Sequence, residues 1–444
     1  MASPRILFSR GSLRLQHQFT RRYRLFSSSS SNSEAPDGLG FSVGSLGLEQ
    51  SFVQPVVASI RQLPEIEALY QDKNFASPSG VENLNRAADV FASFAKGGRE
   101  HLAVCALLAE SKQRMAEYQD VLEILNEMEE FAQKDGSILN SFEDLTLAKA
   151  KTCWTKADFD GAAEMCETII ATYNDFDETF PTSNLHMASA MSGKALSQLA
   201  SMKTMDDAYS VRDYFRIAVK FLERHPPSSN SLSQAAVYGN CGAAEAAYAL
   251  FLEETNDVLV PMDAALRCWF QGMQHLKGSV SADLEMSSNT LQANLQTNLA
   301  WGVLNYEMDR SDRLEKASDY AKQALSAHDG EGGASVWGMR RVLSTVADCY
   351  HQAGSAVTAE GLFQTAIDKK NVIQHPSVLL ELQDSYSSYA KLCENWDKRE
   401  GDAKRLKDQA TEIENRLPDG WKGKSGIYSS LWFWTPSDFL SVGE

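Results

Sequence analysis

The side chains of this sequence with the most definite chemistry are asparagines. An asparagine amide both donates and accepts hydrogen bonds, so it can pair with the backbone of an extended peptide without contacting that peptide's side chains. Amides of this kind recur every three or four residues together with a tryptophan, and one more lies upstream: Asn294, Asn298, Trp301 and Asn305, and Asn240. These amides are therefore candidates for binding a peptide backbone. Hydrogen bonding within the protein itself is the alternative role for these amides.

Basic side chains further along the sequence add a second kind of chemistry. Arg341 and His351 lie in one segment, and either could bind a carboxylate. The sequence lacks the motifs of phosphate-binding loops, dinucleotide-binding turns and zinc proteases. No histidine lies four residues from another, and the seven cysteines form no CxxC pair. We therefore expect no catalytic residue, no metal and no cofactor, and a protein that is not an enzyme.

Helices are the elements that must position these residues. Apolar residues recur at helical spacing over most of the chain, and the alternation typical of strands is scarce. In residues 343–367, small residues at Ala347, Gly354 and Ala359 are interleaved with the large residues Tyr350 and Phe363. This spacing resembles the tetratricopeptide repeat (TPR), in which two antiparallel helices touch at small residues. The resemblance implies an all-α, right-handed α-solenoid, because one repeat cannot bury its apolar face alone.

The same pattern of small and large residues recurs upstream. Predicted first helices are centred near Ala109, Ala150, Ala195, Gly242 and Ala300. Their partner helices carry the following packing residues: Val121, Leu125 and Met128; Ala162, Cys166 and Ile169; Val211, Phe215 and Ala218; Ala264; and Ala317, Ala321 and Ala324. Ala87, Phe91 and Phe94 are expected to pack in the second helix of the first unit.

The spacing of the last repeats points to a subtype. Ala317 and Ala359 are 42 residues apart, and His375-Pro376 follows the second of them. This pattern resembles the 42-residue TPRs of kinesin light chains, in which the His-Pro lies in the loop before the next first helix. A residue before proline disfavours the helical conformation, which fits a loop there.

The TPR resemblance also implies a concave groove that holds protein partners. Fixed positions of each first helix face this groove in TPRs. The residues of this sequence at those positions are Asn240, Asn294, Asn298, Trp301, Asn305, Arg341 and His351. The chaperone-binding members use lysines there to hold a C-terminal carboxylate, whereas Ala236 and Asn294 occupy two of those positions here. We therefore expect an extended segment of another kind of protein partner.

Residues 1–33 differ sharply from the rest. They contain six arginines and nine serines and lack lysine and acidic residues. This composition resembles a mitochondrial presequence, and residues 24–29 resemble the two-step cleavage site of matrix-imported proteins. A disordered basic tail and a plastid transit peptide remain alternatives. We expect a mitochondrial protein, in the matrix.

The charge of the chain limits its partners. The net charge is −17, and it becomes −23 without residues 1–33. Binding to nucleic acid requires lysine and arginine to neutralise phosphates, so we expect no nucleic-acid partner. No apolar run approaches the ~20 residues that span a bilayer, so we expect no transmembrane segment.

The sequence divides into four predicted parts. Residues 1–33 are the targeting presequence, residues 34–80 a linker with short helices, residues 81–417 the TPR-like α-solenoid, and residues 418–444 an aromatic-rich C-terminal tail. Large rigid side chains in this tail could anchor a partner: Trp421, Trp432, Phe433 and Trp434. A cap over the last repeat and a peripheral contact with a membrane surface are the other roles left open.

These observations predict a non-catalytic protein-binding scaffold or assembly adaptor in mitochondria, which binds partner segments in the TPR groove. A respiratory-chain complex assembly factor of the TPR type is one alternative. A regulatory TPR sensor that binds peptides is the other. A scaffold would co-purify with a large complex, whereas a sensor would bind short extended peptides by itself.

Overall fold

The structure is a computed structural model. It describes residues 46, 48, 52–72, 75, 77–134, 142–174, 181–202, 205–223, 227–252, 259–276, 285–306, 312–328, 338–368 and 375–434. Contacts divide the chain into residues 1–40 and 41–444, and every described residue lies in the second unit. The predicted presequence, residues 1–33, lies outside the described residues.

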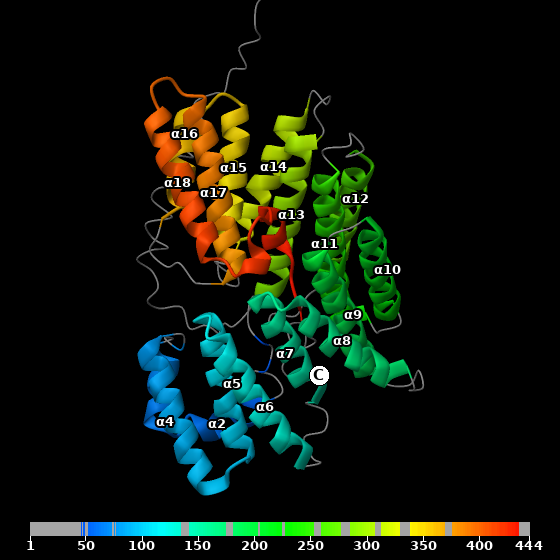
Figure 1. The fold of residues 1–444 in the computed structure, drawn as a ribbon, viewed down its shortest axis with the longest axis vertical. Coiled ribbons are helices and arrows are strands. Elements are labelled where there is room, and N and C mark those ends of the chain that lie inside the picture. The colour runs from blue at the N-terminus through cyan, green and yellow to red at the C-terminus, as the bar shows by residue number, and fades with distance from the viewer. Residues whose placement is uncertain are drawn as a thin grey trace, which may run out of the picture. The chain divides into compact units, whose positions relative to one another are not determined.

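Within the described ranges the second unit consists of helices and turns, without strands (Figure 1). The short N-terminal elements are η2 (Gln54–Val56), α2 (Val57–Ile60) and α3 (Pro64–Asp72). The longer helices are α4 (Pro78–Ala95), α5 (Arg99–Arg114), α6 (Tyr118–Lys134), α7 (Phe142–Lys156), α8 (Phe159–Asn174), α9 (Pro181–Ser201), α10 (Met205–Leu222), α11 (Pro227–Phe251), α12 (Leu259–His275), α13 (Glu285–Tyr306), α14 (Arg313–Ser326), α15 (Met339–Gln352), α16 (Ala356–Ala366), α17 (Pro376–Glu394) and α18 (Glu400–Arg416).

Consecutive helices pack in pairs, from α5 with α6 through α17 with α18. The small residues predicted to lie between paired helices are buried, because a larger side chain would hold the helices apart. Ala150, Ala162, Ala347 and Ala359, for example, have no exposed surface. The predicted all-α fold, a right-handed TPR-like α-solenoid, is confirmed.

One packing prediction is wrong. Phe94 was expected inside the first unit, but 83% of its surface is exposed. The buried side of α4 is confined to its first half, at Gly80, Val81, Leu84 and Ala87. Phe94 lies in the last turn of that helix, beyond this buried side.

Part of the predicted linker is buried. Leu46 and Leu48 have no exposed surface, and their backbone N–H groups donate to the two carboxylate oxygens of Glu110, at 2.7 and 3.4 Å. Burial raises the pKa of Glu110 to about 7, although the N–H donors act in the opposite direction. Residues 34–80 therefore contain a segment that packs on α5, in addition to the expected short helices.

The His375-Pro376 pair stands at a helix start, as its sequence suggests. His375 is the N-cap of α17, and its Nδ1 accepts a hydrogen bond from the Ser377 N–H at 3.3 Å. Pro376 occupies the first helical position, where its missing N–H is not needed.

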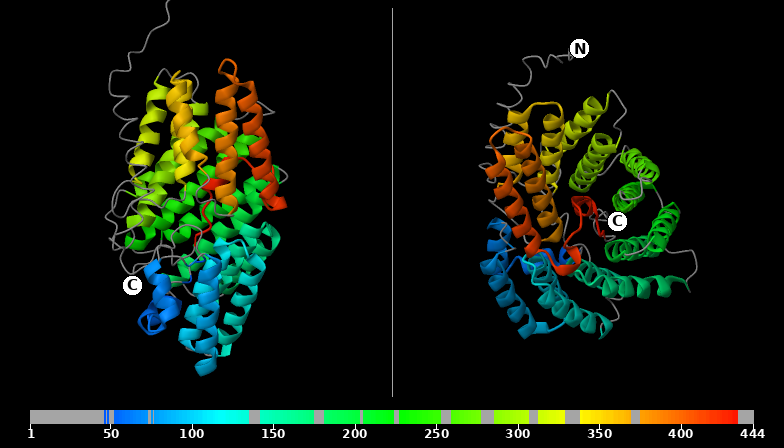
Figure 2. Two further views of the ribbon diagram at one scale, coloured as in Figure 1. Left: turned by 90° about the vertical axis from the view of Figure 1, so that its left-hand side faces the viewer. Right: turned by 45° about the horizontal axis from the view of Figure 1, so that its top comes forward.

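The chain reverses after α18 and returns along the inner side of the helices. Two short 3-10 turns, η6 (Asp419–Trp421) and η7 (Gly426–Ser430), lead into residues 431–434, which are not helical. Figure 2 (right) shows this red segment within the arc of helices, and η7 contacts α17, α11 and α13. Residues 426–434 are called the tail segment below.

Candidate functional site

An asparagine predicted to line the groove holds the tail segment by its backbone. Asn240, on α11, donates from Nδ2 to the Trp432 carbonyl at 2.9 Å. The Trp432 N–H in turn donates to Asn240 Oδ1 at 2.8 Å. Only 1% of Asn240 is exposed. This reciprocal pair is the peptide-binding chemistry predicted for Asn240, but the peptide is the chain's own C-terminal tail.

The helices on either side of α11 bind the tail backbone two residues before and two residues after Trp432. Asn294 on α13 donates to the Ser430 carbonyl at 2.9 Å, and Ser189 on α9 donates to the Trp434 carbonyl at 2.6 Å. Ser430 ends η7 and residues 431–434 are not helical, and the carbonyls of residues 430, 432 and 434 meet successive first helices. The tail segment therefore runs from α13 to α9, against the order of the helices in the sequence.

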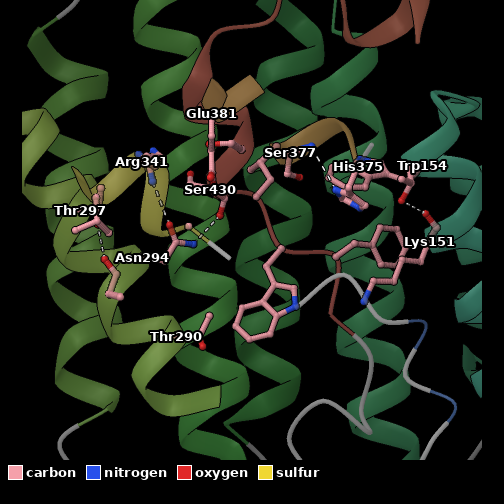
Figure 3. Close-up of a pocket in the computed structure, with 18 of the residues that line it drawn as sticks. Lys151, Trp154, Thr290, Asn294, Thr297, Arg341, His375, Ser377, Glu381 and Ser430 are labelled. Carbon is pink, nitrogen blue, oxygen red and sulfur yellow. Dashed lines mark hydrogen bonds between the residues drawn. The ribbon is translucent and has the colours of Figure 1, made fainter. Parts of the chain in front are cut away.

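Arg341 fixes the orientation of the groove amides. From α15 it donates to Asn294 Oδ1 at 3.1 Å and also to Asn298 Oδ1. A guanidinium has only donors, so each amide must present its oxygen to Arg341. For Asn294, this turns the NH₂ group toward Ser430, as Figure 3 shows. Arg341 was predicted to bind a partner's carboxylate, and in this structure it positions two asparagines.

The opposite side of the tail segment is anchored by an aromatic ring. A Cβ added to Gly193, in the middle of α9, would lie 2.5 Å from the Phe433 ring and 2.9 Å from Cys166 Sγ. Any other residue at position 193 would collide with both groups. Phe433 also contacts the Trp154 ring, with centroids 6.0 Å apart. Gly193 therefore forms the floor of the notch that holds Phe433.

Trp421 fastens the start of the tail to α7 and α8. Its indole N–H donates to the Thr155 carbonyl at 3.1 Å, which satisfies one of the free carbonyls at the end of α7. Its ring meets Trp154 and Phe159 edge to face, with centroids 4.8 and 5.2 Å apart.

All four side chains proposed as tail anchors are buried in the chain itself. Trp421, Trp432, Phe433 and Trp434 are between 1% and 6% exposed. Of the three roles left open by the sequence, their placement resembles the cap. The covered surface differs from the expected one, because the tail lies on the inner faces of α9, α11 and α13 as well as on the last repeat.

A small cavity of about 50 Å³ remains between the tail segment and the surrounding helices. Its polar lining includes Lys151, Arg341, His375 and Glu381. Burial raises the pKa of Glu381 to about 7 and lowers that of His375 to about 3. The space suffices for a few water molecules. Ligand pockets usually measure at least ~300 Å³, so a second ligand has no room beside the tail.

The remaining predicted groove residues lie further along the same helices. Trp301 and Asn305 are near the C-terminal end of α13, and His351 is near that of α15. Asn305 is eleven residues beyond Asn294, which corresponds to ~16 Å along a helix. All three side chains are half-buried. Asn305 donates to the Trp301 carbonyl of its own helix at 2.8 Å. The predicted groove thus has a filled end and a half-exposed end.

Sequence reasoning missed the residues that receive the tail: Thr155, Ser189 and Gly193. A glycine within a helix often marks a close approach by another group, so Gly193 carried a usable signal. Thr155 contributes only its backbone carbonyl, and Ser189 is one of many serines. Neither could have been identified from the sequence.

Two further observations concern possible chemistry. In the described ranges, no three His, Cys, Asp or Glu side chains gather closely enough to hold a metal ion. None of the helices described there combines the length and the apolarity needed to cross a membrane.

Comparisons with known proteins give the chain no family. No family model matches the sequence, and no curated protein matches it. Among solved structures, the human IFIT1 dimer with PPP-AAAA is 14% identical with a TM-score of 0.34, and the match covers 83% of this chain and 85% of IFIT1. Naa15/Naa10 bound to HypK-THB is 12% identical with a TM-score of 0.21, covering 81% of this chain and 66% of the other. Likenesses this distant carry no argument about what the chain binds.

Proposed function

We propose that this protein is a non-catalytic adaptor that binds an extended segment of a partner protein along the inner faces of its first helices. The observation that carries the proposal is the reciprocal pair between Asn240 and the Trp432 backbone. It supports a groove whose amides are placed to hold an extended chain by its backbone alone.

The half-exposed end of the groove is the proposed partner site. The tail segment saturates Asn240 and Asn294, and the small cavity beside it leaves no room for a second chain. Trp301, Asn305 and His351 offer an aromatic surface, an amide and a titratable ring on the same inner faces. A segment bound there would continue the path of the groove beyond the tail.

The net charge is the basis for the proposed class of partner, and residues 1–33 are the basis for the proposed compartment. A net charge of −17 favours partners with basic surfaces and disfavours nucleic acid. The arginine- and serine-rich residues 1–33 are the support for mitochondria, and for the matrix within them. Assembly of a membrane complex, such as a respiratory-chain complex, would suit an adaptor of this kind. A regulatory peptide sensor is the second candidate.

The test is affinity purification of the tagged full chain from mitochondria, followed by mass spectrometry. One variant, Trp301→Ala with His351→Ala, alters the half-exposed end. A second, Asn240→Ala, alters the tail seat, and Phe94→Ala serves as a control because this exposed aromatic lies on α4. We expect the first variant to lose a discrete partner that the control retains.

Other outcomes would change the assignment. Loss of the partner only with Asn240→Ala would mean that the partner replaces the tail. Partners unchanged in both variants, or absent from the wild type, would overturn the groove proposal. A large co-purifying complex would favour the adaptor over the sensor, and recovery of RNA in place of protein would contradict both.

A further inference from the structure

Two cysteines of this chain lie in contact on neighbouring helices. The sulfur atoms of Cys241, on α11, and Cys268, on α12, are 3.7 Å apart, within hydrogen-bonding distance for sulfur. Both residues are partly buried. The other five cysteines are buried: Cys105, Cys153, Cys166, Cys349 and Cys393. The two thiols in contact are thus also the two of the seven that are not in the buried class.

The helices approach each other unusually closely at this point. A Cβ added to Gly242 would lie 2.3 Å from the indole nitrogen of Trp269. That nitrogen donates to the Gly239 carbonyl at 3.2 Å. Each partner in this contact lies one or two residues from Cys241 or Cys268, so the glycines bring the two thiols together. A disulfide needs a sulfur–sulfur bond of ~2.05 Å, and the two sulfur atoms start from contact at 3.7 Å.

Two arginine side chains lie near Cys268, together with one glutamate. Arg267 precedes Cys268, and Arg212 on α10 pairs with Glu245 at 2.5 Å. The hydrogen bond between the two thiols lowers the pKa of Cys268, and both guanidinium groups act in the same direction, against burial and Glu245. Burial raises the pKa of Cys105 and Cys349 to about 12. Cys268 is therefore the better nucleophile, because the thiolate is the reactive form.

We propose that Cys241 and Cys268 form a reversible disulfide when the protein meets a hydroperoxide. In the first step the Cys268 thiolate attacks the terminal peroxide oxygen and the O–O bond breaks. The leaving oxygen takes up a proton as water or an alcohol, and Cys268 becomes a sulfenic acid. In the second step the Cys241 sulfur attacks the Cys268 sulfur, the S–O bond breaks, and the hydroxyl leaves with the Cys241 proton as water.

The balance of this reaction is two thiols and one hydroperoxide giving one disulfide, one water and one water or alcohol. The two cysteines are oxidised together by two electrons, and the hydroperoxide is reduced by the same two. A dithiol reverses the modification by thiol–disulfide exchange. The bond would join α11 to α12 beside Asn240, and so would fasten the helix that holds Trp432.

The test treats the full chain with hydrogen peroxide, alkylates the remaining thiols and maps the peptides by mass spectrometry without reduction. We expect a cross-linked peptide that contains Cys241 and Cys268, lighter by two hydrogen atoms and abolished by dithiothreitol. Recovery of both cysteines alkylated, or Cys268 oxidised to sulfinic acid without a cross-link, would overturn the proposal.

Single variants separate the two steps. Cys241→Ser should leave Cys268 as a sulfenic acid that dimedone traps. Cys268→Ser should slow peroxide-dependent thiol loss by about tenfold, because the remaining thiols are less ionised. Cys349→Ser, a buried site on α15, is the matched control and should cross-link as the wild type does. Equal rates in Cys241→Ser and Cys268→Ser, with circular dichroism confirming that both fold, would also contradict the mechanism.

Discussion

The two ends of the groove use the same kinds of residue on the same helices, with different results. At the filled end, Asn240 and Asn294 are bonded to the tail backbone, and Asn240 is only 1% exposed. At the half-exposed end, Asn305 bonds only to its own helix. Residue type and helix position are therefore insufficient to define a partner site, because the tail segment, residues 426–434, bonds to the asparagines of only one end of the groove.

This difference has energetic consequences. A buried polar group that loses its partner costs more than the hydrogen bond contributed, since water cannot replace the partner. The half-exposed amide can exchange its bond for one to water. Polar substitutions at the filled end should therefore affect folding strongly, whereas replacing the Asn305 amide at the half-exposed end should affect binding more than folding.

The largest effect should come from Trp434→Ala. Trp434 is 1% exposed, and removing a buried aromatic side chain usually costs ~3–5 kcal/mol of unfolding free energy. Urea unfolding measures the change. Phe94→Ala, at a side chain that is 83% exposed, should change stability by less than ~0.5 kcal/mol. A loss below ~1 kcal/mol for Trp434→Ala would mean that the tail is not seated in solution.

Asn240→Ala should follow, with a loss of ~2–4 kcal/mol of unfolding free energy, because it removes the amide that pairs with both the N–H and the carbonyl of Trp432. Hydrogen exchange at the Trp432 amide should accelerate in this variant, since that N–H is no longer bonded. Unchanged exchange at Trp432 would show that Asn240 does not hold the tail.

The free energy of unfolding should depend on pH differently through the histidine at each end of the groove. His375, which lines the cavity beside the tail, has its pKa lowered by burial to about 3, so the native state stays neutral while the unfolded state takes up a proton below its pKa of about 6.5. Stability is therefore lost as the pH falls through this range. Between pH 7 and pH 5, the wild type should lose about 2 kcal/mol relative to His375→Asn, which keeps a capping side chain.

His351 provides the matched comparison at the half-exposed end. Burial lowers its pKa as well, so the sign of the effect is the same. The side chain is half-buried, and we expect His351→Asn to differ less from the wild type at pH 5 than His375→Asn does. Urea unfolding at both pH values measures each difference. Equal pH dependence at the two sites would remove the distinction between the two ends.

Asn305→Ala should have the smallest effect on stability, within about 0.5 kcal/mol, because its amide bonds only to the Trp301 carbonyl of its own helix and stays partly exposed. If the proposed partner binds at the half-exposed end, this variant should still weaken co-purification. A stability loss comparable to that of Asn240→Ala would contradict the division of the groove into two ends.

Local patterns in the sequence were enough to predict the helix pairs. The small residues Ala150 and Ala359 mark helix contacts, and His375-Pro376 marks the start of α17, because these signals lie within a few residues of their effect. The groove position of Asn240 was predictable for the same reason. The binding of the tail segment to Asn240 was not predictable, because Asn240 and Trp432 are separated by 192 residues and no local pattern connects them.

The bond between Ser189 and Trp434 joins residues 245 positions apart, so a segment synthesised much later than α9 completes a contact with it. Ordinary solenoids can fold repeat by repeat as they are synthesised, since each repeat contacts only its neighbours. Here α9 and α11 must wait for residues 426–434 before their inner faces are covered. A chain that stops short of residue 426 would keep those faces exposed, and quality-control proteases could recognise it as incomplete.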